Sequence, residues 1–269
     1  MTLKANTRMY NLTPAVEAAW GRLVAAVSVR ADVPLSVLDH PAPRPVEDLW
    51  ARPDLGLVMM CGWPFARATP QPVAIAAPVM ATPDARDAPI YWSNMIVAAT
   101  SEAKALEDTF GGTLAWTVEG SHSGYNAPRT LLLPHFRSRG PLFRQTVGPV
   151  VTPRGAIEAV TSGRATLAPL DAYAHALLAL YEPETASKIR TVAKTPDAPI
   201  PLFTASPGTD ATLAARLADA LVSLPADEEG RALLADLCLN RFTRIDPSDY
   251  DVGERWHAEA VAAGYARPR

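Results

Sequence analysis

The chain has few cysteines, no long apolar run and no excess of basic residues. Two cysteines in 269 residues, Cys61 and Cys238, cannot build a disulfide framework, and neither lies in a Cys-x-x-Cys pair. No stretch of about eighteen consecutive apolar residues occurs, so the sequence predicts no membrane-spanning helix. The formal net charge is −3, which argues against nucleic-acid or acidic-membrane partners because these favour a basic face.

Motifs for nucleotides, metals and export are also missing. Neither Gly-x-Gly-x-x-Gly nor Gly-x4-Gly-Lys-Ser/Thr occurs, and the histidines lack metal-ligand spacings such as His-x3-His. We therefore expect no cofactor and no metal ion. The opening residues, MTLKANTRMYNLTP, have no apolar segment and no small-residue cleavage site, so the sequence as given predicts a cytoplasmic protein without a signal peptide.

Short apolar runs alternate with amphipathic stretches along the rest of the chain. Leu55–Cys61 is apolar on both faces, as a central strand is, and Thr13-Pro14 predicts the start of a helix with a buried stripe that extends to Val27. The alternation predicts an α/β fold with mixed, mostly parallel sheets. Further predicted strands are Thr7–Asn11, Leu35–Leu38, Val73–Met80, Ile90–Ala99, Leu114–Val118, Val147–Val151, Thr166–Leu170, Ile189–Ala193 and Leu202–Ala205.

Two proline-punctuated segments, Thr82–Pro89 and Thr195–Pro201, separate the middle of the chain from its ends. They are either two surface loops or two crossings between lobes. On the second interpretation residues 1–85 and 200–269 form lobe 1, residues 86–199 form an inserted lobe 2, and the crossings form a hinge. Ligands of such folds bind at the carboxyl ends of strands.

The segment Gly120–Arg129, GSHSGYNAPR, lies between an apolar run and a predicted helix. It is not a serine nucleophile elbow, because the central residue of that motif must be serine and here it is His122. An anion site fits better, since Ser121 and Ser123 carry hydroxyl donors, Gly124 lets the backbone approach a ligand, and the N–H groups at a helix start are partially positive. The alternative is a capped helix start with nothing bound.

Several short motifs occur together in a recognisable order. The most specific is Ser-x-Ser-Gly-Tyr after a strand, and the others are Met9-Tyr10, Leu49-Trp50, Pro53-Asp54-Leu55, Cys61-Gly62-Trp63-Pro64, Tyr91-Trp92-Ser93, Asn126 with Arg129, and Asp171. From about Met9 to Pro201 the chain resembles the phosphate/phosphite/phosphonate-type substrate-binding proteins of ABC transporters, a branch of the type II periplasmic binding fold. The resemblance implies a two-lobed Venus-flytrap protein that captures a small anionic ligand between its lobes for uptake through an ABC permease.

The resemblance also implies ligand-binding residues. In the second lobe Ser121, Ser123, Gly124 and Tyr125 match the anion turn, and His122 either donates to an oxyanion or faces solvent. Other matching positions are Tyr10 and Cys61-Gly62-Trp63 on the first lobe, and Tyr91 and Ser93 on the segment that enters the second lobe, where Tyr91 is a cleft wall or a core residue.

Two further positions carry alternatives. Asp171 matches an acidic residue that pairs with the amine of aminophosphonates, or it caps the helix that follows. Arg154 stands near the place of a family histidine, so it is either a bidentate anion partner or a surface arginine.

Two other function classes remain open at this point. One is a cytoplasmic enzyme on the same fold, similar to those of menaquinone or thiamine-pyrimidine synthesis, and the other is a small-molecule sensor, because fold does not decide function. The sequence offers no acid–base pair beyond His122 and Asp171, so we expect no catalytic residues and favour solute binding. If that role holds and the start is incomplete, the protein is periplasmic.

Overall fold

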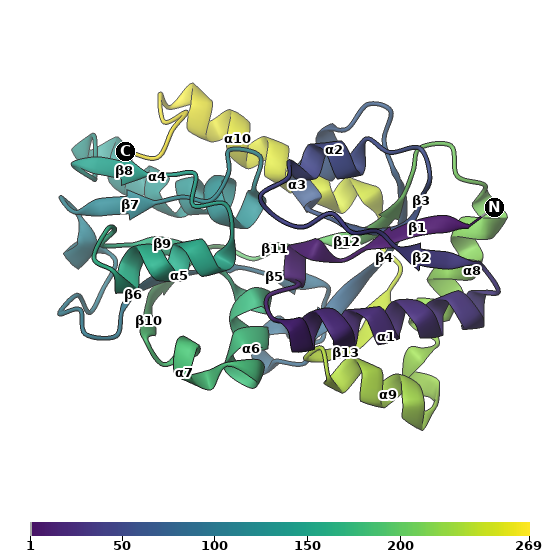
Figure 1. Ribbon diagram of the computed structural model, residues 1–269. Coiled ribbons are helices and arrows are strands. Elements are labelled where there is room, and N and C mark those ends of the chain that lie inside the picture. Colours follow the sequence, from purple (N-terminus) through teal and green to yellow (C-terminus); the bar gives the residue numbers. More distant parts are fainter. Residues whose placement is uncertain (1) are drawn as a thin grey trace. The chain divides into compact units, whose positions relative to one another are not determined.

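Two compact units make up the chain in the computed structural model, which describes residues 2–269 (Figure 1). Unit 1 comprises the residues up to Ile90 and Pro199–Tyr250, and unit 2 comprises Tyr91–Ala198 and Asp251–Arg269. The first two passages between the units contain β5 (Ile90–Tyr91) and β11 (Ala198–Pro199), which pair with each other. A third passage follows Tyr250, so residues 251–269 belong to unit 2, whereas the sequence had suggested lobe 1 for all of 200–269.

Unit 1 contains a six-stranded sheet with the order β13-β4-β12-β3-β1-β2. The strands are β1 (Leu3–Asn6), β2 (Leu35–Val37), β3 (Leu55–Met60), β4 (Val73–Met80), β12 (Leu202–Ala205) and β13 (Leu239–Thr243). β1 is parallel to β2 and β3, but β12 is antiparallel to β3 and β4, and β13 is antiparallel to β4. The sheet is therefore mixed, with fewer parallel pairs than the sequence had suggested.

Local sequence explains the first helix and the central strand of unit 1. The Thr13 hydroxyl accepts a hydrogen bond from the N–H of Val16, Pro14 occupies the first helical position, and the apolar stripe is buried. Every residue of β3 is buried, as its apolar sequence predicted. The helices of this unit are α1 (Pro14–Ala31), α2 (Val46–Trp50), α3 (Gly62–Arg67), α8 (Ala211–Val222) and α9 (Glu228–Ala235), with short 3-10 turns at Arg8–Tyr10, Pro83–Ala85, Leu224–Ala226 and Pro247–Asp251.

The predicted strand Thr7–Asn11 is wrong. β1 ends at Asn6, whose side-chain oxygen accepts from the N–H of Arg8, and the N–H of Tyr10 bonds back to Thr7. An asparagine that bonds to the backbone two residues on competes with a strand ladder and turns the chain. Arg8–Tyr10 is consequently a 3-10 turn between β1 and α1.

Unit 2 contains a three-stranded antiparallel sheet with the order β10-β6-β9, and a parallel pair β7/β8 beside it. Its strands are β6 (Ser93–Ala98), β7 (Thr113–Ala115), β8 (Gln145–Val147), β9 (Ala168–Asp171) and β10 (Ile189–Lys194). The predicted strand Val147–Val151 is wrong for most of its length, because the pairing ends at Val147, just before Gly148-Pro149. Proline has no N–H to donate to the ladder.

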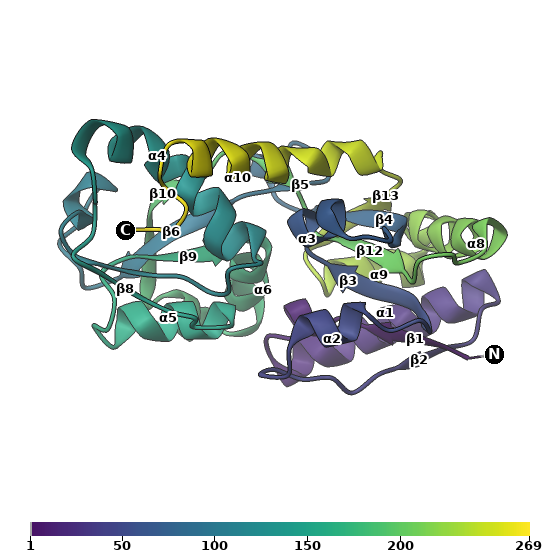
Figure 2. The same ribbon diagram turned by 90° about the horizontal axis from the view of Figure 1, so that it is seen from above.

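The helices of unit 2 include one element from the far end of the chain. They are α4 (Ala127–Arg139), which continues a π-helical turn at His122–Asn126, α5 (Pro153–Thr161), α6 (Ala172–Tyr181), α7 (Pro183–Ala186) and α10 (Val252–Ala262), with a 3-10 turn at Glu107–Thr109. α10 packs beside α4, as both views of the ribbon show (Figures 1 and 2). Tyr265, just after α10, is fully buried in the core of this unit with Leu114, Leu132 and Leu167.

Within residues 2–269, no helix combines the length and the apolar character needed to cross a bilayer.

Candidate functional site

The serine turn, residues Ser121–Gly124, opens the helix that runs through α4. The chain leaves β7, and the N–H of Thr117 donates to the carbonyl of Gly124 at 3.2 Å. The Ser121 hydroxyl accepts from the N–H of Gly124 at 2.9 Å, and the N–H of Asn126 reaches the Ser121 carbonyl at 3.1 Å. These bonds make Ser121 the N-cap of the helix, so the turn faces the partially positive end of the helix dipole.

Both serines keep hydrogen-bond donors available at this helix start. A serine hydroxyl has one O–H donor and two lone pairs, and the cap uses only one lone pair of Ser121. Ser123 is half-buried, and in residues 2–269 neither its hydroxyl nor its N–H donates to another group. Its carbonyl accepts from the Ser93 hydroxyl at 2.7 Å, which holds the peptide in place. The turn therefore presents two hydroxyls and a backbone N–H, a donor set suited to an oxyanion.

Gly124 is needed for a reason different from the one that the sequence suggested. A Cβ atom at Gly124 would lie 1.7 Å from Oγ1 of Thr117 and 2.7 Å from its Cβ. The glycine thus admits the side chain of the residue that leads into the turn. Close approach of a ligand to the backbone is not required to explain it.

His122 is a buried, neutral part of the turn, so the solvent-facing alternative is wrong. Its side chain is 3% exposed, and burial lowers the pKa of the imidazole from 6.5 to about 4. The ring stacks on Trp256, with centroids 5.3 Å apart and planes at 22°, and lies 6.2 Å from the ring of Tyr91. At neutral pH His122 brings no positive charge to an anion.

Successive side chains of the strand that enters unit 2 point to opposite faces, and this decides which of them lie next to the serine turn. Tyr91 and Ser93 contact His122 and Ser123 respectively. Trp92 lies on the other face, where its indole N–H donates to Oδ1 of Asn94 at 3.0 Å. Tyr91 is 1% exposed, so it is both a core residue and a neighbour of the turn.

Residues 251–269, the C-terminal segment, contact the helix just behind the serine turn, and no sequence pattern predicted this contact. Nδ2 of Asn126 donates to the carbonyl of Gly253 at 2.7 Å, and Nη1 of Arg129 donates to the carbonyl of Ala266 at 2.8 Å. The hydroxyl of Tyr125 also donates to Ala266, at 3.3 Å, and the Arg129 guanidinium lies 4.7 Å from the Tyr125 ring. Burial lowers the pKa of Arg129 and raises that of Tyr125.

Asp171 and Arg154 take part in contacts within unit 2 that favour the structural alternatives. Oδ1 of Asp171 accepts from the N–H groups of Tyr173 and Ala174, at 2.9 and 3.0 Å, so the carboxylate caps α6. Arg154, in the first turn of α5, bonds to Glu182 at 2.5 Å, and this pairing lowers the pKa of the glutamate. Both side chains of that pair are partly exposed.

The candidate residues of unit 1 gather at one edge of its sheet. Tyr10 follows β1, and Cys61, Gly62 and Trp63 follow β3, and the carboxyl ends of these parallel neighbours meet at the same edge. All four are buried. A Cβ at Gly62 would lie 2.3 Å from the ring of Tyr250, whose hydroxyl donates to a backbone carbonyl at 2.9 Å, so the glycine admits that ring. The candidates therefore form two groups, one in each unit.

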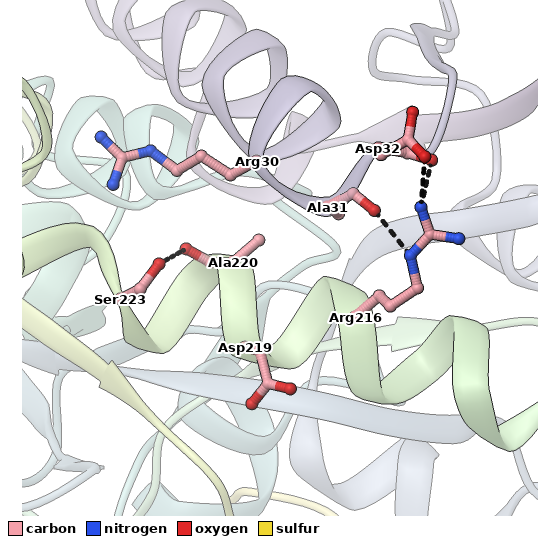
Figure 3. Close-up of a pocket in the computed structure, with 7 residues that line it drawn as sticks. All are labelled: Arg30, Ala31, Asp32, Arg216, Asp219, Ala220 and Ser223. Carbon is pink, nitrogen blue, oxygen red and sulfur yellow. Dashed lines mark hydrogen bonds and ion pairs between the residues drawn. The ribbon is translucent and has the colours of Figure 1, made fainter.

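A surface depression of about 380 Å³ lies elsewhere on unit 1, between the end of α1 and α8 (Figure 3). Its charged groups pair with one another or with nearby side chains: Arg216 bonds to the carbonyl and the carboxylate of Asp32, Arg30 to Asp227, and Asp219 to Arg244. Since these charges are already paired, we do not place the anion there. In residues 2–269 no cluster of three His, Cys, Asp or Glu side chains could hold a metal ion.

Comparisons with known proteins agree on one family. The model of the periplasmic substrate-binding proteins of phosphonate ABC transporters matches residues 11–250. Among solved structures, a binding-protein component of an ABC phosphonate transporter from Pseudomonas aeruginosa has a TM-score of 0.80 at 18% identity, over 98% of this chain and 88% of that one. PhnD1 from Prochlorococcus marinus, in complex with methylphosphonate, has a TM-score of 0.80 at 15% identity, over 97% and 98% of the two chains.

More distant likenesses share the same architecture. MatC from Rhodopseudomonas palustris with bound malate has a TM-score of 0.62 at 14% identity, over 97% of this chain and 98% of that one. A search among curated proteins gives no match. The structural likenesses show the type II periplasmic binding fold that the sequence predicted, and the family is one of solute-binding transport proteins rather than enzymes. The chain belongs to the family of periplasmic substrate-binding proteins of phosphonate ABC transporters.

Proposed function

We propose that the protein captures a small phosphonate- or phosphate-like anion on the serine turn and delivers it to an ABC permease. Membership of the family implies a small ligand and a permease partner. The ordinary compartment of the family is the periplasm, so we propose that the protein acts there, in preference to the cytoplasmic location suggested by its opening residues.

The observation that carries this proposal is the set of donors at Ser121 and Ser123. A phosphonate group has three oxygens that accept hydrogen bonds, and the two hydroxyls and the N–H of Ser123 are available donors at a helix start. Recognition through neutral donors suits an anion that carries its own charge, because hydrogen bonds to a charged acceptor are stronger than those between neutral groups. The neutral imidazole of His122 agrees with this mode of recognition.

The unit 1 candidates, Tyr10, Cys61, Gly62 and Trp63, stay predicted ligand-binding residues, and no role in the anion site on the serine turn is assigned to them. Asp171 is assigned to capping α6 and Arg154 to its pair with Glu182, so neither is part of the proposed anion site.

Calorimetric titration tests the proposal directly. Methylphosphonate, phosphate, phosphite and malate would be added separately to the full chain, with tight binding expected for at least one phosphorus oxyanion. Ser123→Ala should weaken that binding by about 1–3 kcal/mol, because one oxygen of the anion loses its donor. Ser138→Ala is the matched control: Ser138 lies on the same helix, is exposed and bonds to a carbonyl of its own turn. Failure of all three phosphorus oxyanions to bind, or unchanged affinity in Ser123→Ala, would contradict the proposal.

A further inference from the structure

The serine turn is held by its own hydrogen bonds and also by packing from another part of unit 2. His122–Asn126 is a π-helical turn, a conformation that is rare and concentrated at functional sites. Pro128 lies in the first turn of α4 and has no N–H to donate to the carbonyl of Gly124, which accepts from the N–H of Thr117. One helical bond is therefore lost at Pro128, and the side chains that pack against the turn add to what fixes its geometry.

Helix α10 supplies that packing. The half-buried indole of Trp256 stacks on the imidazole of His122, with centroids 5.3 Å apart and planes at 22°. One turn earlier on α10, the carbonyl of Gly253 accepts from Asn126, the last residue of the π-helical turn. α10 therefore contacts both ends of the π-helical turn, His122 at its start and Asn126 at its end.

We propose that Trp256 is a positioning residue for the anion-binding turn. His122 lies between Ser121 and Ser123 in the chain, and its ring is stacked on Trp256 at 5.3 Å and lies 6.2 Å from the ring of Tyr91. A ring fixed in this way fixes the peptide that carries the donors of both serines, and pre-organised donors bind an anion without the cost of being ordered at the moment of binding. The effect on affinity rests on the proposed function. The effect on the geometry of the turn does not.

Amide hydrogen exchange tests the geometry without any ligand. In the full chain, Trp256→Ala should speed exchange of the hydrogen-bonded amides within residues 121–126, those of Ser121, Gly124 and Asn126, by roughly 10-fold, the equivalent of one aromatic contact. Trp256→Phe, which keeps an aromatic ring, should stay close to the parent chain. Val261→Ala, a change at an exposed position on the same helix, should leave the exchange unaltered. If Trp256→Ala does not fold, Trp256→Leu takes its place, since it keeps apolar volume and loses the stacked ring, and the same increase is expected.

Titration of the same variants with methylphosphonate tests whether a loosened serine turn binds the anion more weakly. Trp256→Ala or Trp256→Leu should bind about 10-fold more weakly, with Trp256→Phe restoring most of the affinity and Val261→Ala unchanged. Unchanged exchange at residues 121–126 would overturn the positioning role, and so would faster exchange with unchanged affinity. If the parent chain binds neither methylphosphonate nor phosphate, the proposed function fails, and the exchange measurement still decides whether Trp256 holds the turn.

Discussion

Replacing Gly124 by alanine is the most direct way to perturb the serine turn. The new Cβ would lie 1.7 Å from Oγ1 of Thr117 and 2.7 Å from both Cβ and Cγ2 of that residue. Thr117 is 8% exposed, and its N–H bonds to the carbonyl of Gly124, so it cannot move away without breaking that bond. Overpacking in a core costs about 1–3 kcal/mol, and one lost hydrogen bond adds about 1 kcal/mol, so Gly124→Ala should lower the free energy of unfolding by about 2–4 kcal/mol.

Thr117→Ala tests whether the clash with the Thr117 side chain causes the loss of stability in Gly124→Ala. Oγ1 of Thr117 is buried and makes no hydrogen bond within residues 2–269, so its removal loses little beyond a methyl group, about 1 kcal/mol. Because Thr117→Ala removes two of the three crowded atoms, the double variant should be more stable than the sum of the single changes predicts. Urea unfolding followed by far-UV circular dichroism gives the free energies. A Gly124→Ala chain within about 0.5 kcal/mol of the parent, or strictly additive changes, would refute the reasoning.

Two more outcomes are expected from titratable groups. Because burial lowers the folded-state pKa of His122 from 6.5 to about 4, the unfolded chain takes up a proton first as the pH falls. Its contribution to stability is therefore complete above about pH 6.5 and declines toward pH 4, by about 1.4 kcal/mol per pH unit. The urea midpoint should fall less between pH 6.5 and pH 4 in His122→Gln than in the parent chain. The fall that remains in the variant includes the contribution of His175, whose pKa is also lowered by burial. Arg154→Ala should cost at most about 1 kcal/mol of stability, since its pair with Glu182 is partly exposed, and should leave anion affinity within about twofold. A tenfold loss of affinity would instead make Arg154 an anion partner.

Much of the fold could be predicted because its signals are local. α1 has its cap, its proline and its apolar stripe within eighteen residues, and β3 is apolar along its whole length. Thr7–Asn11 was wrong because a single asparagine side chain ended the strand early, a competition that apolar patterning does not register. The placement of residues 251–269 was missed because their partners lie more than a hundred residues earlier in the sequence.

For the candidate site too, local sequence patterns could be predicted and contacts between distant segments could not. Ser121 and Ser123 became candidates because a serine-rich turn between a strand and a helix is a local pattern, and the structure adds which of their donors remain available. The sequence could not show that Thr117 explains the glycine at 124, because that depends on how two segments fold against each other. Trp256 carries no motif at all; only the packing of α10 on unit 2 reveals it.

The third passage of the chain, after Tyr250, sets the order in which the protein can be completed during synthesis. Unit 1 has its whole sheet once β13 has been made, whereas the core of unit 2 includes Tyr265, and the bonds from Asn126 to Gly253 and from Arg129 to Ala266 span 127 and 137 residues. Closing contacts of such long range is slow, because the loop entropy is lost before the contacts form. While a ribosome is still adding α10, the serine turn has been made but lacks its support, so the part of the molecule that we assign to anion capture is among the last to reach its final form.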